Sequence, residues 1–281
     1  MKKLTALMFL FVILNNLYSN DSYLNQKFHY VSEYATVIIS KDCIEFDTEK
    51  EQGKFLESKN FDMFKGEKHN YILLNCTIED DFILTLLYKT GKNYYKYSEW
   101  EEQYSKVSNE LHSSAALQAF QAVKTSSFIT ENDKSNNKIE YTPHASLFNR
   151  DNNPWAISEN AEEKYIVITP RKYRAEGFAY APINYLIFLN GFVCADKDYL
   201  YEQNSRAKKV RISYDEVAFD AELQDKGNYQ CVKLPRPINP LANKEIKVEI
   251  LDSYKGSKYS DIVISGIYYL DAVLKDSCCK W

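Results

Sequence analysis

The sequence lacks the short motifs that identify the common classes of hydrolase and nucleotide-binding enzyme. It contains no GxSxG, HExxH or phosphate-loop motif. Acid pairs such as Asp80-Asp81 and Glu162-Glu163 fall in predicted turns or loops, where a charged pair is usually solvated. The histidines are few and scattered: His29, His69, His112 and His144. These absences disfavour an enzyme. The missing motifs do not bear on a glycosidase, which needs only two facing carboxylates.

An excess of positive charge is also absent. The chain has 35 lysines and arginines against 39 aspartates and glutamates, which gives a net charge of −4 and a pI near 5.7. Nucleic acid is therefore not expected as a partner, because phosphate backbones attract basic proteins. Beyond residue 20 there is no long uncharged apolar run, so no second membrane segment is predicted.

The first residues have the layout of a secretory signal peptide. Lys2 and Lys3 precede a charge-free apolar stretch from Leu4 to Leu14, which is short for a membrane span. Residues 1–19 are expected to be removed, and the mature protein to be secreted or periplasmic. An uncleaved N-terminal anchor is the alternative. The first cysteine is Cys43, so a lipid-modified N-terminal cysteine is not supported.

The cysteine spacing shows neither a disulfide pattern nor a metal site. The even number of cysteines in an exported chain permits disulfides. Cys43 with Cys76 is the pairing that keeps a bridge within one domain, whereas buried thiols are the alternative, and Cys278-Cys279 could instead bridge outwards. No CxxC spacing or histidine cluster supports zinc. The six cysteines are Cys43, Cys76, Cys194, Cys231, Cys278 and Cys279.

The composition and the early part of the chain favour strands. Tyrosine (23) and phenylalanine (15) are abundant and proline (7) is scarce, and aromatic residues fit pleated sheets. Short apolar runs separated by turn signals predict a β-meander, so residues 20–97 are expected to form a small β-rich domain. The predicted strands are Tyr34–Ser40, Tyr71–Ile78, Phe82–Tyr88 and Tyr94–Tyr97.

The spacing of apolar residues changes over residues 98–121 and predicts a connecting helix. Ser98 and Glu101 have the spacing of a capping box. Trp100, Tyr104, Val107 and Leu111 recur at helical spacing and run into an Ala-rich stretch. Such a stripe usually packs on a domain, and a partner-binding helix is the alternative.

Residues 122–275 again show short, regularly spaced strands, followed by a Cys-containing tail at 276–281. This pattern predicts an antiparallel β-sandwich or jelly roll. The clearest runs are Lys164–Pro170, Ile183–Phe192 with its Asn-Gly turn signal, and Ile246–Ile250. The expected fold class is therefore mainly β: a C-terminal jelly roll preceded by a small β-rich domain and a helix.

A succession of landmark stretches points to a known family. In order they read "KTSSFITE", "IEYTPHASL", "NPWAI", "YLIFLNGF", "YLYEQNSRAKKVRI", "VKLPRPI" and "ILDSYKGSKYSDIVISGI". Over residues 123–274 the chain resembles the discoidin-like, galactose-binding-like NAD glycohydrolase translocation domain, also called the NADase-type glycan-binding domain. In one respect it departs: where members show a Gly- and Glu-rich approach to a strand, this chain has only Gly177.

The resemblance implies a jelly roll that binds glycans or assists delivery to a cell surface, without catalysis. In the toxins that gave the domain its name, a separate domain performs the NAD chemistry, and residues 20–121 look unlike such an enzyme. No cofactor is implied. Discoidin-like jelly rolls often hold a structural calcium, but no Asp-rich ligand series identifies one here, so the metal is unknown.

Six residues are candidates for binding a ligand. Trp155 offers a flat face for stacking on a sugar, or plugs the end of the sandwich. Arg206 could fork onto a carboxylate or sugar hydroxyls, or form an internal ion pair with Asp261, which we favour. The remaining four lie in the loop before the last strand: Tyr254, Lys255, Lys258 and Tyr259.

That loop has two equally weighted interpretations. Its tyrosines could stack on a ligand ring while its lysines bind an acidic sugar, since loops at one end of a sandwich often carry function. Alternatively, Tyr259 and Asp261 close the sandwich by side-chain hydrogen bonds. Gly256 permits a tight turn in either case.

The sequence thus predicts an exported, non-enzymatic protein whose discoidin-like domain recognises glycan or cell-surface ligands. Its N-terminal unit would pair with another component. The alternative is a structural or assembly protein of the bacterial cell envelope that uses the jelly roll for protein–protein contact.

Overall fold

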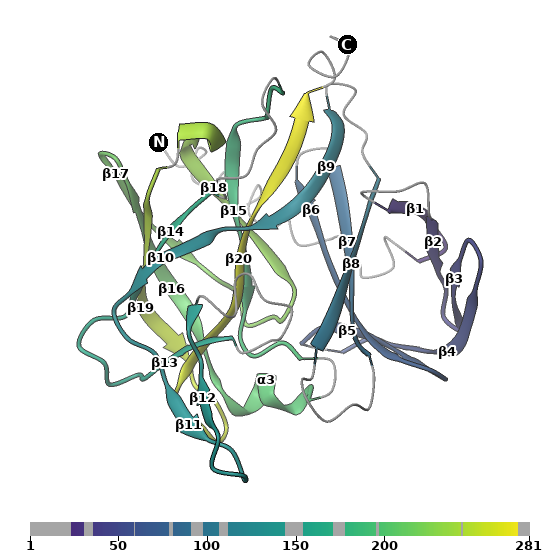
Figure 1. Cartoon of the computed structure of the whole chain (residues 1–281), viewed down its shortest axis with the longest axis horizontal. Coiled ribbons are helices and arrows are strands. Elements are labelled where there is room, and N and C mark those ends of the chain that lie inside the picture. Colours follow the sequence, from purple (N-terminus) through teal and green to yellow (C-terminus); the bar gives the residue numbers. More distant parts are fainter. Residues whose placement is uncertain are drawn as a thin grey trace, which may run out of the picture.

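The computed structural model describes residues 24–30, 36–58, 60–78, 81–90, 98–106, 112–143, 154–170, 178–194, 197–242 and 244–274 (Figure 1). The predicted signal peptide, the strand Tyr94–Tyr97 and the tail with Cys278 and Cys279 lie outside these residues.

The first eight strands form a closed antiparallel barrel (Figure 1). Each pairs with the next, and β1 pairs with β8 to close the ring. This confirms the predicted β-rich unit, and β8 extends it past residue 97. The strands are β1 (Lys27–Tyr30), β2 (Thr36–Ile39), β3 (Cys43–Phe46), β4 (Lys50–Leu56), β5 (Asp62–Gly66), β6 (Asn70–Ile78), β7 (Asp81–Thr90) and β8 (Ser98–Lys106).

The helix predicted over residues 98–121 is wrong. This segment forms β8, β9 (His112–Ala119) and β10 (Gln121–Thr125). Trp100 and Tyr104, which are four apart, fit a strand as well as a helix, because an even separation returns to the same face of a sheet. Val107 and Leu111, the other residues of the predicted stripe, lie outside the described residues. Tertiary pairing decides between the two: β8 hydrogen-bonds to both β7 and β1, and β9 to β20 (Ile262–Leu274).

The C-terminal part is a two-layered β-sandwich, which confirms the predicted jelly-roll class. Strands run in the order β10-β14-β19-β16-β20-β15-β18, with β9 and β13 added on β20 and β17 on β16. The elements not yet bounded are β11 (Thr130–Asn132), β12 (Lys138–Glu140), β13 (Trp155–Ile157), β14 (Tyr165–Thr169), β15 (Ile183–Asn190), α3 (Tyr199–Gln203), β16 (Ser205–Tyr214), β17 (Val217–Glu222), β18 (Tyr229–Ile238), η3 (Pro240–Ala242) and β19 (Ile246–Tyr254).

The sandwich core lies between β14, β19 and β16 on one side and β15, β18 and β20 on the other. It is formed by β-branched and aromatic side chains, including Ile166, Val248 and Phe188, that alternate inwards along each strand. Asn190-Gly191 ends β15 without the predicted turn, and Gly191 forms a β-bridge to Ile264 with a φ of 85°. A side chain there would meet the ring of Tyr201, so the position requires glycine.

A second apolar cluster joins the barrel to the sandwich. Alternation along β6 sends Tyr71 and Leu73 into the barrel, while Ile72 and Leu74 point outwards onto the sandwich. They meet side chains such as Ile187 from β15 on the facing sheet. The two β units are therefore packed together through a buried apolar interface.

Polar contacts fix the register of this interface. The Tyr229 hydroxyl donates to Thr85 Oγ1 at 3.1 Å, and both side chains are buried. The Asn75 backbone N–H donates to Asn228 Oδ1 at 2.7 Å. Buried hydrogen bonds with such geometric demands allow one relative placement of the two units.

Candidate ligand-binding surface

Trp155 lies in the sandwich core. Its side chain is 1% exposed and packs in the main apolar cluster, and its Nε1–H donates to the Ser127 carbonyl at 3.2 Å. Strand β13 places it there by pairing with β20. Because the ring is covered and its N–H has a partner, Trp155 plugs the sandwich, which is the interpretation that the sequence favours, and it offers no face for stacking on a sugar.

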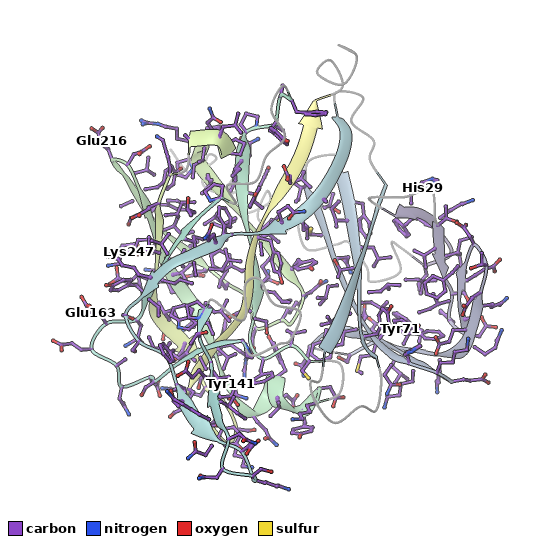
Figure 2. All side chains as sticks on the ribbon, viewed as in Figure 1. His29, Tyr71, Tyr141, Glu163, Glu216 and Lys247 are labelled. Atoms are coloured by element: carbon purple, nitrogen blue, oxygen red, sulfur yellow. The ribbon has the colours of Figure 1, made fainter. Side chains whose placement is uncertain are left out.

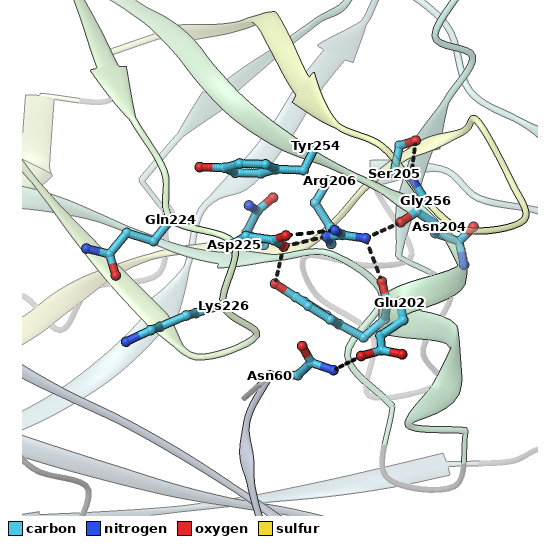
Figure 3. Close-up of polar contacts among 12 residues, drawn as sticks. Asn60, Glu202, Asn204, Ser205, Arg206, Gln224, Asp225, Lys226, Tyr254 and Gly256 are labelled. Carbon is cyan, nitrogen blue, oxygen red and sulfur yellow. Dashed lines mark hydrogen bonds and ion pairs between the residues drawn. The ribbon is translucent and has the colours of Figure 1, made fainter. Parts of the chain in front are cut away.

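Arg206 forms a buried ion pair, but its partner is Asp225 and not the expected Asp261 (Figure 3). The guanidinium is 6% exposed and donates through Nε and Nη2 to the two Asp225 carboxylate oxygens, at 2.7 and 2.9 Å. Its Nη1 donates to the carbonyls of Tyr201 and Asn204 at 3.1 and 2.7 Å. With its donors turned inwards, Arg206 ties the turn after β17 to α3.

The same pair perturbs a neighbouring tyrosine. The Tyr201 ring lies under the Arg206 guanidinium, with its centroid 5.1 Å away, and its hydroxyl donates to Asp225 at 3.4 Å. Burial, together with the Asp225 charge, raises the pKa of Tyr201 far above its usual range. The tyrosine therefore stays neutral, and this group of residues is a structural lock.

The loop between β19 and β20 is built onto α3. The backbone N–H groups of Lys258 and Tyr259 both donate to the Gln203 carbonyl, at 3.1 and 2.8 Å. Gly256 sits so close to the same helix that a side chain would collide with the backbone of Gln203 and Asn204. The predicted need for glycine is thus a close backbone approach, and the loop has a fixed shape.

Two of the candidate residues in this loop are held by intramolecular contacts. The Tyr254 hydroxyl donates to the Leu223 carbonyl at 3.1 Å, and the Lys208 ammonium lies 5.9 Å from its ring centroid. Lys255 forms an ion pair with Glu159. Tyr254 is half-buried, whereas Lys255 stays exposed and is held only by this surface ion pair.

Tyr259 and Lys258 are exposed, and the structure adds Tyr199 beside them. Tyr199 is 52% exposed and Tyr259 38% exposed. The Lys258 ammonium lies 4.8 Å from the Tyr259 ring centroid, and hydrogen bonding to Tyr259, with a contribution from Tyr199, raises the pKa of Lys258. Two aromatic rings and a cation therefore share one open surface at the helix end of the sandwich.

Acidic side chains lie beside a third tyrosine, Tyr141. The Tyr141 hydroxyl donates to Glu131 Oε2 at 3.3 Å, and burial followed by the Glu131 charge raises the pKa of Tyr141 to about 12. Asp261 and Tyr259 act on Tyr141 as well. Burial, with a further contribution from Glu131, raises the pKa of Asp261. The labelled Tyr141 marks this end of the molecule, below the sandwich (Figure 2).

We call this group the tyrosine surface. It comprises Glu131, Tyr141, Tyr199, Lys258, Tyr259 and Asp261. Sequence reasoning found Lys258 and Tyr259 but missed Tyr141 and Tyr199. Both lie in the landmark stretches "IEYTPHASL" and "YLYEQNSRAKKVRI", which was the available signal. Nothing in a periodic pattern says that the β11–β12 hairpin and α3 meet at one end.

Other kinds of site have less support. Within the described residues, no group of three or more histidine, cysteine, aspartate or glutamate side chains is arranged to hold a metal ion. A small pocket lies between barrel and sandwich, lined by residues that include Ile78, Pro182 and Leu270. It contains no titratable cluster. Over the same described part of the chain, no helix is both long and apolar enough to cross a membrane.

The comparison with protein families concerns the sandwich. Residues 177–270 match the model of the NAD glycohydrolase translocation F5/8 type C domain. This segment is a discoidin-like domain. The match confirms the resemblance inferred from the landmark stretches, and α3, β16 and the β19–β20 loop fall within it. No curated protein and no solved structure matches the chain.

The discoidin-like domain is completed by strands that precede the matched segment. β14 pairs with β19, and β13 with β20, so residues before 177 belong to the same two layers. Four members of the tyrosine surface lie inside the match: Tyr199, Lys258, Tyr259 and Asp261. Glu131 and Tyr141 come from the preceding part.

Proposed function

We propose that the protein is an exported, non-enzymatic binding protein whose tyrosine surface recognises glycans on cells. The observation that carries the proposal is a pair of exposed tyrosines, Tyr199 and Tyr259, near Lys258 at the loop end of a discoidin-like domain. Exposed aromatic faces are the groups on which sugar rings stack, and a rigid scaffold presents them without an ordering cost.

The absence of an enzymatic role agrees with the matched family, which is the translocation part of an NAD glycohydrolase and not the catalytic part. The barrel adds a second unit that is packed against the domain through a buried interface. In this proposal the barrel is the site where another protein component attaches, and the discoidin-like domain reaches the cell surface.

The charges of the tyrosine surface favour a neutral sugar over the acidic sugar expected from the sequence. Lys255 is engaged by Glu159, which leaves Lys258 as the cation of the surface. Glu131 and Asp261 place carboxylates beside the tyrosines, where they repel a sialic or uronic acid but accept hydrogen bonds from sugar hydroxyls. Binding is therefore expected to depend little on salt.

A glycan array tests the proposal. Wild type is compared with Tyr199→Ala/Tyr259→Ala and with a matched control, Tyr165→Ala. Tyr165 also lies under a lysine, Lys247, with its ring centroid 4.4 Å from the ammonium, but it belongs to β14 and not to the tyrosine surface. We expect neutral glycans to be bound by wild type and control and lost by the double variant.

Failure of a folded wild type to bind any glycan would favour the alternative, an envelope assembly protein. Pull-down of one stoichiometric protein partner, released by the same double variant, would then identify that role. Export is tested separately by sequencing the N-terminus of the protein recovered outside the cytoplasm, with a start near Asn20 expected after removal of residues 1–19.

A further inference from the structure

Two cysteines face each other across the junction of barrel and sandwich. Along β6, the alternation that points Ile72 and Leu74 out of the barrel also points Cys76 outwards, into the interface cluster. Along β18, Tyr229 faces the barrel, and Cys231 follows two positions later on the same face. The Asn75–Asn228 hydrogen bond holds these two strands side by side.

The packing of β18 against β6 brings the thiols of Cys76 and Cys231 together at the edge of the interface cluster. Each thiol shifts the pKa of the other. Cys76 is 6% exposed, whereas Cys231 is at the open edge of the interface. Cys43 is the partner expected for Cys76. Its thiol instead contacts the Ser40 hydroxyl, within the turn that joins β2 and β3.

We propose that Cys76 and Cys231 form a disulfide that locks the barrel onto the discoidin-like domain in an oxidising compartment. The described cysteines are thiols in this structure. The oxidant is a disulfide, either a small one such as oxidised glutathione or that of an oxidoreductase. In the exchange, one S–S bond of the oxidant breaks and the Cys76–Cys231 bond forms. The two thiol protons pass to water or to the two thiolates that leave.

The environments of the two sulfurs set the order of attack. The hydrogen bond from Cys76 lowers the pKa of Cys231, whereas the same bond and burial raise the pKa of Cys76. Cys231, exposed and richer in thiolate, attacks the oxidant first and forms a mixed disulfide. Cys76 then attacks the Cys231 sulfur and releases the second thiol. We expect the bond to close without opening the interface, because β6 and β18 already pack side by side there.

Non-reducing peptide mapping tests the proposal on the full chain. The purified protein is reduced, treated with oxidised glutathione, blocked with an alkylating reagent and digested. We expect one linked peptide pair containing Cys76 and Cys231, and, before oxidation, faster alkylation of Cys231 than of Cys76. Cys43→Ser is the matched control because it removes another buried thiol, and it should leave the linked pair unchanged.

Two outcomes would overturn the proposal. One is a native-like protein in which both Cys76 and Cys231 remain open to alkylation after prolonged oxidation. The other is a linked pair that joins Cys76 to a different cysteine. Cys231→Ser keeps the size of the side chain, so it should fold. In this variant we expect glutathione to leave no intramolecular link at Cys76.

Discussion

The contribution of the buried Arg206–Asp225 pair to stability can be compared with that of a second arginine–aspartate pair, which makes a similar contact on the exposed surface. Arg211 and Asp220 also form a two-point pair, with a shortest N–O distance of 2.7 Å, equal to that of the buried pair. The difference is burial: the Arg206 side chain is 8% exposed and that of Arg211 is 48% exposed. The two pairs therefore separate the effect of burial from that of geometry.

Arg206→Met keeps the bulk of the side chain and removes its charge. Removing one partner of a buried ion pair lowers the free energy of unfolding by roughly 3–5 kcal/mol, because the other charge stays buried without a partner. Asp225 is 36% exposed and regains some water, but the carbonyls of Tyr201 and Asn204 lose a buried donor. We expect a loss near the lower limit, about 3 kcal/mol, which corresponds to a fall in Tm of roughly 6–12 °C.

Urea unfolding followed by tryptophan fluorescence, together with thermal scans, measures this loss for Arg206→Met and Arg211→Met. The surface variant should differ little from wild type, because solvent screens the pair even though Arg211 and Lys209 lower the pKa of Asp220 to about 2. Equal losses for the two variants, or a stable Arg206→Met protein, would refute the view that this pair is a structural lock.

Three further predictions concern other polar groups. Burial would raise the pKa of Glu51, but hydrogen bonds from Tyr71 and from nearby backbone N–H groups lower it overall, so its stabilising effect is present above pH 4.5 and is lost as the pH falls further. Glu51→Gln should accordingly flatten the acid limb of a stability–pH curve, and an unchanged limb would exclude this role. Asp261 has a raised pKa, so its charged form is disfavoured by folding, and Asp261→Asn should increase the urea midpoint at pH 7 but not at pH 3. Tyr229→Phe leaves the buried Thr85 hydroxyl without its donor and should cost about 1 kcal/mol in urea unfolding; no loss would mean that the Tyr229–Thr85 bond does not hold the interface.

The strands of the fold could be predicted because apolar alternation is a local property. Tyr71–Ile78 and Ile183–Phe192 were both identified within one or two residues of β6 and β15. The helix prediction over residues 98–121 failed because the Trp100–Tyr104 spacing of four fits either a helix or a strand, and because pairing partners distant in sequence decide the outcome. The closure of the barrel depends on β1 meeting β8, which no local pattern specifies.

The site could be predicted only in part for a related reason. Tyr259 and Lys258 were found because they sit in one short loop, whereas Tyr141 and Tyr199 come from distant segments that the topology brings to the same end. The partner of Arg206 was missed because Asp225 lies in a turn whose position depends on β17 and β18. The Cys76–Cys231 contact likewise needs the packing of barrel on sandwich, so a pairing guess confined to one domain chose Cys43.

The measurement that tests the central claim most directly is a titration of the mature protein with the neutral glycan that gives the strongest array signal. Stacking on an aromatic ring contributes on the order of 1 kcal/mol, so loss of both tyrosines should weaken the Kd by about 10- to 100-fold. This weakening is expected for Tyr199→Ala/Tyr259→Ala, with an unchanged Kd for Tyr165→Ala. An equal Kd for all three proteins, or no glycan bound by folded wild type, would contradict it.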